Sequence, residues 1–495
     1  MIRNIVVLGA GSAGLIAALT LKRKLPQLEV RVIRSPEIGI IGVGEGTTAA
    51  FPRHFFEYLK LDPADFYQHA EPTWKLGIKF LWGPTPEFYY SFDREYAARQ
   101  PNLARNNGFY MDDGIPWAGR ISAFMAHDKA FPRKSDGTPA IHNKHAFHIE
   151  NLKLVALLER WCRQYGVAIT DGTMERVELE ASTNDPSVAA LHLKDGERVT
   201  ADLFVDASGF RSELIGKALR ESYVDYSPSL FCDRAVIGGW SRTDEVIKPY
   251  TVAETYDAGW AWQIEHEDWI NRGYVYSSPF ISDEEALAEL LRKNPKISNE
   301  PRVVRFRSGR YQRNWIGNVV GIGNAVGFVE PLEATALQVV CVESSTLADT
   351  LADSLQDPGD YIKLLYNRYN GEQWDEIRDF LAVHYAFNNR LDTPFWHACR
   401  ADTDLAGAVP IVEFFKENGP SAVATEVLLK PTNSFGIDGY QAMLVGQRVP
   451  HGKRYTPPHA DLKHWQHYRQ AVAKDAKNGL DVRECLDFLR QCGVA

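Results

Sequence analysis

Glu333 lies in the most informative stretch of this sequence, residues 330–337, which follows a glycine-rich turn at residues 321–324. On its own, this carboxylate would be a helix N-terminal residue that the helix dipole stabilises. Two further groups could do chemistry, namely Lys79 and the tryptophan pair in residues 260–262. The first 48 residues look like a dinucleotide site. Each of these features has a physical interpretation of its own.

The N-terminal residues have the pattern of a dinucleotide-binding motif. Ile2–Leu8 is a mostly apolar run of strand length, residues 9–14 read Gly-Ala-Gly-Ser-Ala-Gly, and an Ala- and Leu-rich helix extends to about Leu25. The first glycine permits a tight turn, the second lets the backbone approach a pyrophosphate, and the third allows close helix–strand packing. The helix N-terminus offers N–H donors to the phosphates. The alternative is a glycine turn without a ligand. The predicted cofactor contacts are Gly9, Gly11, Ser12, Ala13 and Gly14.

The residue that should bind the ribose departs from this motif. An acidic residue is expected about 20 positions further on, but Arg34 and Ser35 follow the second strand, with Glu37 close behind. Residues 40–47 then place three glycines around one carboxylate. This composition indicates backbone pressed against a flat or anionic group, or merely a flexible loop. Its candidate cofactor contacts are Ile41, Val43 and Gly44.

Two later segments fit the same domain. Residues 203–209 read as a buried strand that runs into a turn, and they resemble a segment of flavoprotein hydroxylases. Residues 319–324 are another buried strand ending in glycine, a point at which flavoproteins of the glutathione-reductase type return to their cofactor. Asp206 and Leu337 complete the predicted cofactor contacts. One complete motif leaves room for one dinucleotide, FAD, and NADPH has no evident domain.

Lys79 belongs to a stretch, residues 74–80, in which apolar and other residues alternate, as is typical of a strand. Alternation places Lys75, Gly77 and Lys79 on one face. Most lysines lie in water, and Lys75 and Lys79 would then both be exposed; the alternative is that Lys79 projects into a cavity. Trp260 and Trp262 also alternate, so both indoles share a face, where core packing is their ordinary role.

Together, these features resemble the flavin-dependent tryptophan-halogenase family. Lys79 corresponds to its active-site lysine in a matching Lys-x-x-x-Lys-Phe context, and Glu333 to its active-site glutamate. Thr335 and Ala336 correspond to the residues that hold halide beside the flavin, partly through backbone N–H groups. The family signature Pro-Leu-Glu-Ser-Thr has Ala334 in place of serine. The resemblance continues through residues 377–396 and 441–447.

A second family signature, Trp-x-Trp-x-Ile-Pro, is thought to keep the flavin away from the organic substrate. Here Trp260 and Trp262 are present, but Glu265 stands where the proline is expected. The resemblance therefore implies an active-site shield at these tryptophans with an altered end.

The resemblance implies a two-component halogenase. FADH2 from a separate NAD(P)H-dependent flavin reductase, O2, and bromide or chloride would yield hypohalous acid. This oxidant would reach Lys79, which either donates a hydrogen bond or forms a haloamine. An electron-rich aromatic ring, indole-like or phenolic, would take up the halogen, and Glu333 would position Lys79 or stabilise the cationic intermediate. A flavin-dependent aromatic hydroxylase and a non-catalytic flavoprotein are the alternatives.

The substrate is less well defined. The segments near residue 101 and around Tyr440 lack the aromatic arrangement associated with tryptophan-binding members of the family. Free tryptophan is therefore the less favoured substrate, and a carrier-bound substrate stays open.

Composition limits the partners. The 495 residues suffice for two or three cores, and a formal charge of −9 argues against nucleic acid or an anionic membrane as partner. Six scattered cysteines are typical of reduced thiols in a cytoplasmic protein, and no metal site is expected. A homodimer stays open.

The expected fold is α/β. A glutathione-reductase-type FAD-binding domain should span residues 1–355 and include a loop-rich segment at 81–150 and an antiparallel substrate-side sheet at 221–310. A mainly helical substrate-side domain should follow at residues 356–495.

Overall fold

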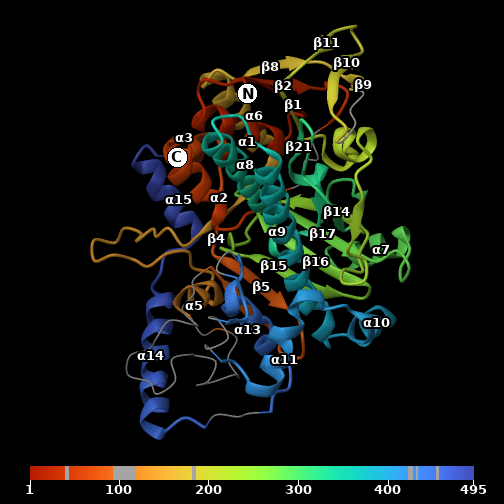
Figure 1. The fold of residues 1–495 in the computed structure, drawn as a ribbon. Coiled ribbons are helices and arrows are strands. Elements are labelled where there is room, and N and C mark those ends of the chain that lie inside the picture. Colours follow the sequence, from red (N-terminus) through yellow and green to blue (C-terminus); the bar gives the residue numbers. More distant parts are fainter. Residues whose placement is uncertain are drawn as a thin grey trace. The chain divides into compact units, whose positions relative to one another are not determined.

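The computed structural model describes residues 1–39, 44–92, 117, 119–180, 185–421, 427–430, 433–452 and 456–494. The chain forms two compact units, each assembled from three segments (Figure 1). The first unit comprises residues 1–71, 149–226 and 306–375, and the second comprises residues 72–148, 227–305 and 376–495.

This division by compactness differs from a split at one point of the chain. Residues 72–148 and 227–305, assigned to the FAD-binding part on sequence grounds, group with the C-terminal segment. The boundary between functional domains near residue 355 stays a prediction. Within the loop-rich segment at 81–150, residues 93–116 and 118 lie outside the described residues.

The first unit is built on a six-stranded sheet with the order β20-β21-β12-β1-β2-β8, in which only β20 is antiparallel. Since parallel strands end at the same edge, the turns after β1, β12 and β21 gather there, where α/β sheets bind ligands. The strands are β1 (Asn4–Leu8), β2 (Glu29–Arg34), β8 (Ala168–Asp171), β12 (Leu203–Asp206), β20 (Trp315–Ile316) and β21 (Val319–Gly321).

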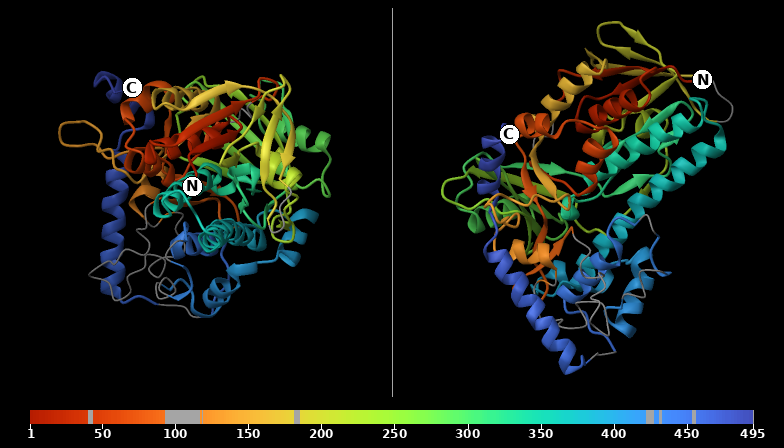
Figure 2. Two further views of the ribbon diagram at one scale, coloured as in Figure 1. Left: turned by 45° about the horizontal axis from the view of Figure 1, so that its top comes forward. Right: turned by 90° about the vertical axis from the view of Figure 1, so that its left-hand side faces the viewer.

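Both faces of this sheet are covered, and its strands β1, β12 and β21 are mainly apolar. On one face, α1 (Ser12–Lys24) packs against α6 (Asn151–Gln164) and α8 (Ala336–Asp353). The right-hand view of Figure 2 shows α1 and α8, in red and teal, side by side. On the other face, Val6, Leu8 and Phe204 share a core with the sheet of β9 (Met174–Leu179), β10 (Val188–Leu193) and β11 (Arg198–Val199).

The second unit contains a seven-stranded sheet with the order β18-β14-β17-β16-β15-β5-β6, antiparallel except between β15 and β5. Helix α7 (Asp283–Lys293) packs on β14 and β17. The strands are β5 (Gly77–Leu81), β6 (Phe88–Ser91), β14 (Arg234–Ser241), β15 (Thr251–Tyr256), β16 (Gly259–Glu265), β17 (Trp269–Tyr276) and β18 (Arg302–Arg305).

The C-terminal segment is mainly helical, as predicted. Local signals set its helix ends: the Thr393 side chain accepts a hydrogen bond from the Trp396 N–H, and Asp481 with Glu484 forms a capping box. Aromatic side chains join the helices to β6, with Tyr90 and Phe380 ring centroids 5.9 Å apart. The helices are α9 (Asp360–Phe387), α10 (Pro394–Asp402), α11 (Val409–Asn418), α13 (Gly436–Gly446), α14 (His459–Lys477) and α15 (Val482–Gln491).

The mixed α/β class with a helical C-terminus is therefore confirmed. Helix α14 runs beside α5 (Arg120–Ala126) in the second unit (Figure 2). Across the described ranges, no helix has both the length and the apolar character needed to cross a membrane.

Candidate active site

The three glycines of the N-terminal motif have different surroundings. A Cβ on Gly9, whose φ is +117°, would lie 2.4 Å from the Ala207 carbonyl oxygen, and one on Gly14 would lie 1.9 Å from the Gly9 carbonyl oxygen. A Cβ on Gly11 would meet nothing within 4 Å. A side chain at Gly9 or Gly14 would clash with neighbouring backbone, so the fold itself requires these two glycines. Gly11 instead faces open space, which an approaching pyrophosphate needs.

The start of α1 suits a phosphate. Gly11 is its N-cap, no side chain caps it, and its first turn carries no acidic residue. The Ser12 hydroxyl donates a 2.7 Å hydrogen bond to Asn151 Oδ1 in the core, so only its backbone N–H could serve a ligand. A Cβ on Gly323 would lie 3.2 Å from the Ala13 Cβ, which places the turn after β21 against this helix start.

Asp206, at the end of β12, is buried and fully engaged by its own turn. Its Oδ1 accepts hydrogen bonds from the Ser208 N–H and hydroxyl, and its Oδ2 accepts from the Leu214 and Ile215 N–H groups at 2.8 and 3.0 Å. Burial raises the pKa of Asp206, while these hydrogen bonds oppose the shift. The carboxylate therefore shapes the turn, and a cofactor contact by Asp206 itself stays a prediction.

The other predicted cofactor contacts divide into three cases. Ile41 and Val43 lie outside the described residues, whereas Gly44 is buried at the start of β3 (Gly44–Gly46). Leu337 is buried in the first turn of α8. Beside Gly44, burial raises the pKa of Glu45 to about 7.

Arg34, at the position where an acid was expected, is bound by carboxylates of its own unit. Its guanidinium donates to Asp171 Oδ1 at 2.7 Å and to Glu159 at 3.0 Å. It is thus part of the fold rather than a free group for the ribose.

Glu333 precedes a helix start that suits an anion. It is buried at the end of a short 3-10 turn, Pro331–Glu333. Ala334 then has a φ of +56°, a left-handed conformation that costs a non-glycine residue about 1–2 kcal/mol. Thr335 is the N-cap of α8, and neither a side-chain cap nor an acidic residue occupies the first turn, which begins at Ala336. Uncapped N–H groups at the start of an 18-residue helix are a ready anion site.

Lys79 lies on β5 beside a carboxylate that sequence reasoning missed. Its Nζ is 2.5 Å from Glu87 Oε2, and the two side chains are 19% and 34% exposed. The Nζ also lies 5.5 Å from the Tyr89 ring centroid and 5.9 Å from that of Tyr250. The sequence Gly-Pro-Thr-Pro at residues 83–86 is a turn signal, and it could have predicted the hairpin that returns Glu87 to Lys79.

The strand expected at residues 74–80 is broken at Leu76. Residues Thr73–Lys75 form β4, and β5 begins at Gly77. Lys75 is 0% exposed, with its Nζ 5.5 Å from the Phe92 ring centroid. The expectation that both lysines lie in water is therefore wrong for Lys75, because the break moves it into a different strand pair, with β7 (Ala146–Glu150).

Trp260 and Trp262 share one face of β16, as their alternation predicted, with ring centroids 6.0 Å apart. Their face is opposite to that of Lys79. Lys79 pairs with Val252, and Val252 pairs with Gln263, so these three side chains share a face. Both tryptophans are buried and favour a packing role. Active-site shielding stays a prediction.

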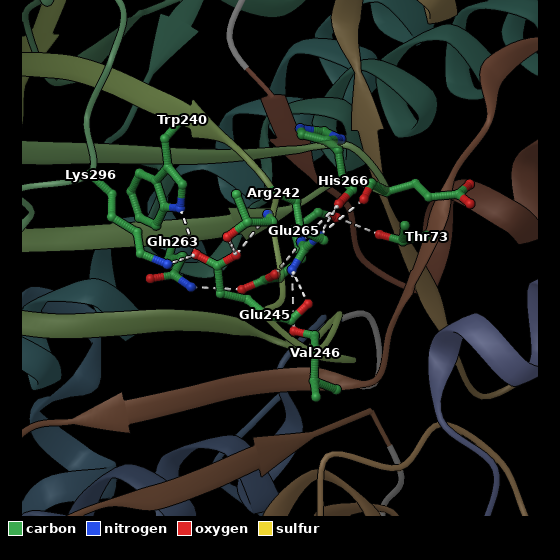
Figure 3. Close-up of polar contacts among 11 residues, drawn as sticks. Thr73, Trp240, Arg242, Glu245, Val246, Gln263, Glu265, His266 and Lys296 are labelled. Atoms are coloured by element: carbon green, nitrogen blue, oxygen red, sulfur yellow. Dashed lines mark hydrogen bonds and ion pairs between the residues drawn. The ribbon is translucent and has the colours of Figure 1, made fainter.

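Glu265, which stands in place of the expected proline, is held in a buried polar network (Figure 3). Its Oε2 lies 2.5 Å from Arg242, and the two side chains are 1% and 2% exposed. The guanidinium also donates to the His266 carbonyl oxygen, while Gln263 Nε2 donates to Glu265 Oε1 at 2.7 Å. The Thr73 hydroxyl donates to the Glu265 carbonyl oxygen. The end of β16 is thereby fixed from several directions.

Within the part of the chain that the structure describes, no group of three or more His, Cys, Asp or Glu residues could hold an ion.

Comparison with known proteins gives one consistent family. A family model described as tryptophan halogenase matches residues 4–461. The tryptophan 6-halogenase ThaL of Streptomyces albogriseolus is 33% identical over 431 residues, covering 80% of this chain and 78% of ThaL. The structure of MibH, a lanthipeptide tryptophan 5-halogenase, is 37% identical with a TM-score of 0.91, covering 99% of this chain and 94% of MibH. BrvH, a flavin-dependent halogenase from Brevundimonas sp. BAL3, is 26% identical with a TM-score of 0.85, covering 99% of each chain.

The family predicted from the sequence is confirmed, and so is the FAD-binding type of α/β fold. The chain belongs to the tryptophan-halogenase family and is a flavin-dependent halogenase.

Proposed function

We propose that this protein halogenates an electron-rich aromatic ring with hypohalous acid, and that Lys79 delivers the halogen. The observation that carries the proposal is the placement of Lys79. It lies on β5 of the seven-stranded sheet in the second unit, ion-paired and only 19% exposed, within a chain of the halogenase family. A single fixed donor in a largely dry site gives an indiscriminate oxidant its selectivity.

The cofactor in this proposal is FAD, delivered as FADH2 by a separate NAD(P)H-dependent reductase. When bound and reduced, it supplies the reaction with O2 that oxidises halide. Gly11 and the uncapped start of α1 would hold its pyrophosphate, and the turns after β12 and β21 would adjoin it. The halide, bromide or chloride, would bind the backbone N–H groups of Thr335 and Ala336 at the start of α8.

Lys79 acts in our proposal as a hydrogen-bond donor to hypohalous acid rather than as a haloamine. The Glu87 carboxylate lies 2.5 Å from the Lys79 Nζ and holds it in an ion pair, a geometry that suits hydrogen-bond donation rather than attack by a nitrogen lone pair. The donated hydrogen bond draws electrons towards the oxygen. As the bond between oxygen and halogen breaks, the halogen bonds to a ring carbon, and the oxygen leaves as hydroxide, which takes up a proton and becomes water. The ring then loses a proton. Glu333 is assigned the stabilisation of the positive charge that develops in the ring.

The proposed substrate is an indole, with a peptide-borne tryptophan ahead of free tryptophan and a phenol behind both. Support for the peptide comes from the similarity to MibH, named as a lanthipeptide tryptophan 5-halogenase, over 99% of this chain. ThaL, named as a tryptophan 6-halogenase, supports the indole. A panel of indoles, phenols, tryptophan and tryptophan-containing peptides, each with chloride and bromide, would identify the ring by product mass.

Two variants test the site. Lys79→Ala should abolish halogenated product while flavin reoxidation continues, because only the transfer step is lost. Glu333→Gln keeps the shape and removes the charge, and should slow turnover roughly 100–1000-fold, as for one lost electrostatic contact. Lys153→Ala is the matched control, because Lys153 also pairs with a glutamate, Glu71, at 2.5 Å.

Normal halogenation by Lys79→Ala would mean that free hypohalous acid is the reagent and would refute the assignment. Products that gain oxygen without halogen would instead indicate hydroxylation.

A further inference from the structure

We infer that Glu87 is a positioning residue for Lys79, holding its ammonium in one orientation for halogen transfer. The inference deepens the proposed function and rests on it. No sequence signature pointed to Glu87; it follows from the contacts of the β5–β6 hairpin in the second unit.

The register of the hairpin brings Glu87 to Lys79. Lys79 pairs directly with Tyr89 across the antiparallel β5–β6 ladder. Residues two apart on a strand project to the same face, so the chain just before β6 presents Glu87 on the Lys79 side. The result is the 2.5 Å contact between Lys79 Nζ and Glu87 Oε2.

The hairpin loop that carries Glu87 is anchored at several points. Trp82 Nε1 donates to the His384 carbonyl oxygen at 2.9 Å, and the Gly83 N–H donates to Asn388 Oδ1 at 3.0 Å. The Arg390 guanidinium donates to the Thr85 carbonyl oxygen at 2.8 Å. These contacts hold the loop to the C-terminal segment of the same unit, so Glu87 is presented from a fixed backbone.

The carboxylate of Glu87 is itself held on both sides. While Oε2 faces Lys79, Oε1 accepts a 2.8 Å hydrogen bond from the Tyr89 hydroxyl. Burial and this hydrogen bond both raise the pKa of Tyr89, so the phenol keeps its proton and remains a donor. Both carboxylate oxygens are thus engaged, which restrains the Glu87 side chain.

Two aromatic rings complete the surroundings of the ammonium. The Tyr89 and Tyr250 rings meet edge to face with centroids 6.0 Å apart, and Lys79 Nζ lies over both. The Tyr250 hydroxyl is fixed by a 2.5 Å hydrogen bond to Asp128 Oδ1. The rings attract the cation but do not fix its direction, whereas the carboxylate does.

The chemistry requires such an anchor. A lysine side chain is long and flexible, and its ammonium has three equivalent donors. One of these N–H donors binds Glu87. The other two can then bind the oxidant, and they point in a defined direction. Without Glu87, Lys79 would remain present but would sample many rotamers, and oxidant would be lost as peroxide or free hypohalous acid.

The test compares Glu87→Gln with Glu71→Gln, which breaks a Lys–Glu pair of the same 2.5 Å length at Lys153. In turnover with reductase, bromide and a tryptophan-containing substrate, Glu87→Gln should lower halogenated product per flavin oxidised roughly 10–100-fold, the cost of a misplaced reacting group. The KM for substrate should stay within about twofold, since ground-state binding is not changed. Glu87→Asp should restore part of the yield, and Glu71→Gln should behave as the wild-type protein.

A second readout needs no turnover. The protein without flavin is treated with an amine-reactive reagent, trinitrobenzenesulfonate, and labelling of the Lys79 peptide is measured by mass spectrometry. Glu87→Gln should label Lys79 several-fold faster than the wild-type protein does, because the carboxylate no longer holds the Nζ in its 2.5 Å contact. Glu71→Gln should change labelling at Lys153 and not at Lys79.

Unchanged labelling of Lys79, or unchanged product yield in a correctly folded Glu87→Gln protein, would overturn the inference. If Glu87→Gln does not fold, Tyr89→Phe decides, since it removes the hydroxyl that donates to Glu87 and keeps the ring. Wild-type yield and wild-type labelling in that variant would then overturn the inference. Halogenation by Lys79→Ala would instead refute the proposed function.

Discussion

Replacing Gly11 by alanine should weaken FAD binding and leave the fold intact, whereas the same replacement at Gly14 should destabilise the fold. Both glycines belong to the turn between β1 and α1, and the added group is one methyl in each case. At Gly14 the new Cβ would lie 1.9 Å from the Gly9 carbonyl oxygen and 3.2 Å from the Ala207 Cβ. Backbone cannot yield as a side chain can, so the overpacking cost is at least about 1–3 kcal/mol.

At Gly11 the same methyl meets no protein atom within 4 Å, and the backbone angles, φ −77° and ψ −180°, suit any residue. The stability cost is therefore limited to that of a poorer N-cap, on the order of 1 kcal/mol or less. For a bound pyrophosphate the methyl occupies the space of approach. Loss of one backbone hydrogen bond to a charged group costs about 1.5–3 kcal/mol, which weakens binding roughly 10- to 100-fold.

The assay separates the two effects. Thermal unfolding is measured without FAD, and the FAD dissociation constant is measured by quenching of flavin fluorescence. Gly11→Ala should unfold near the wild-type temperature and bind FAD weakly, while Gly14→Ala should unfold at a clearly lower temperature. Wild-type FAD affinity in Gly11→Ala would show that no pyrophosphate lies over Gly11. A Gly14→Ala protein of normal stability would refute the close packing of α1 against the turn.

Three further outcomes are expected. Bromide should give at least as much product as chloride, because bromide is more easily oxidised and backbone N–H donors accept either anion; a strict chloride preference across several substrates would contradict this. Glu343→Ala removes the acceptor of three buried donors, Gly323 N–H, Trp374 Nε1 and Asn314 Nδ2, and should lower the unfolding free energy in denaturant titrations by about 1–3 kcal/mol for each donor left unpaired. Burial raises the pKa of Glu343 in the folded protein to about 8. The contribution of its protonated carboxyl to the free energy of unfolding should therefore be full below about pH 4.5 and be lost as pH rises through 8. The alanine variant should lack this pH dependence. Lys75→Ala should lower the unfolding temperature rather than be tolerated, because Lys75 is 0% exposed.

Most of the structure that could be predicted from the sequence was predicted from local residue patterns. The strand, glycine turn and helix of residues 2–25 follow from steric rules that act within a few residues, and β1 and α1 form where expected. The alternation of Trp260 and Trp262 likewise placed both indoles on one face. The helix start after Glu333 was likewise expected from neighbouring residues, whereas the missing side-chain cap was not, because threonine often caps a helix and Thr335 does not.

Features that depend on strand register were out of reach. Lys79 and the tryptophan pair project from opposite faces because of the way β5 pairs with β15. The paired residues Lys79 and Val252 are far apart in the sequence, so local patterns do not predict this arrangement. The burial of Lys75 depends on the break at Leu76, next to Gly77, and the glycine alone does not tell which strand Lys75 then pairs with. Glu87 depended on the length of a hairpin loop, and one residue more or less would turn it away from Lys79.

Glu265 shows how this chain can depart from a family signature and keep the local structure. A proline at the end of β16 would restrict the backbone by fixing φ and removing an N–H. Glu265 restricts it by contacts instead: Arg242 binds its carboxylate, Gln263 donates to the same group, and Thr73 donates to its carbonyl oxygen. Removing one partner of such a buried pair costs about 3–5 kcal/mol, so these contacts restrain the end of β16 strongly. The strand that carries the two tryptophans therefore keeps its alternation up to its last residue, although the proline is absent.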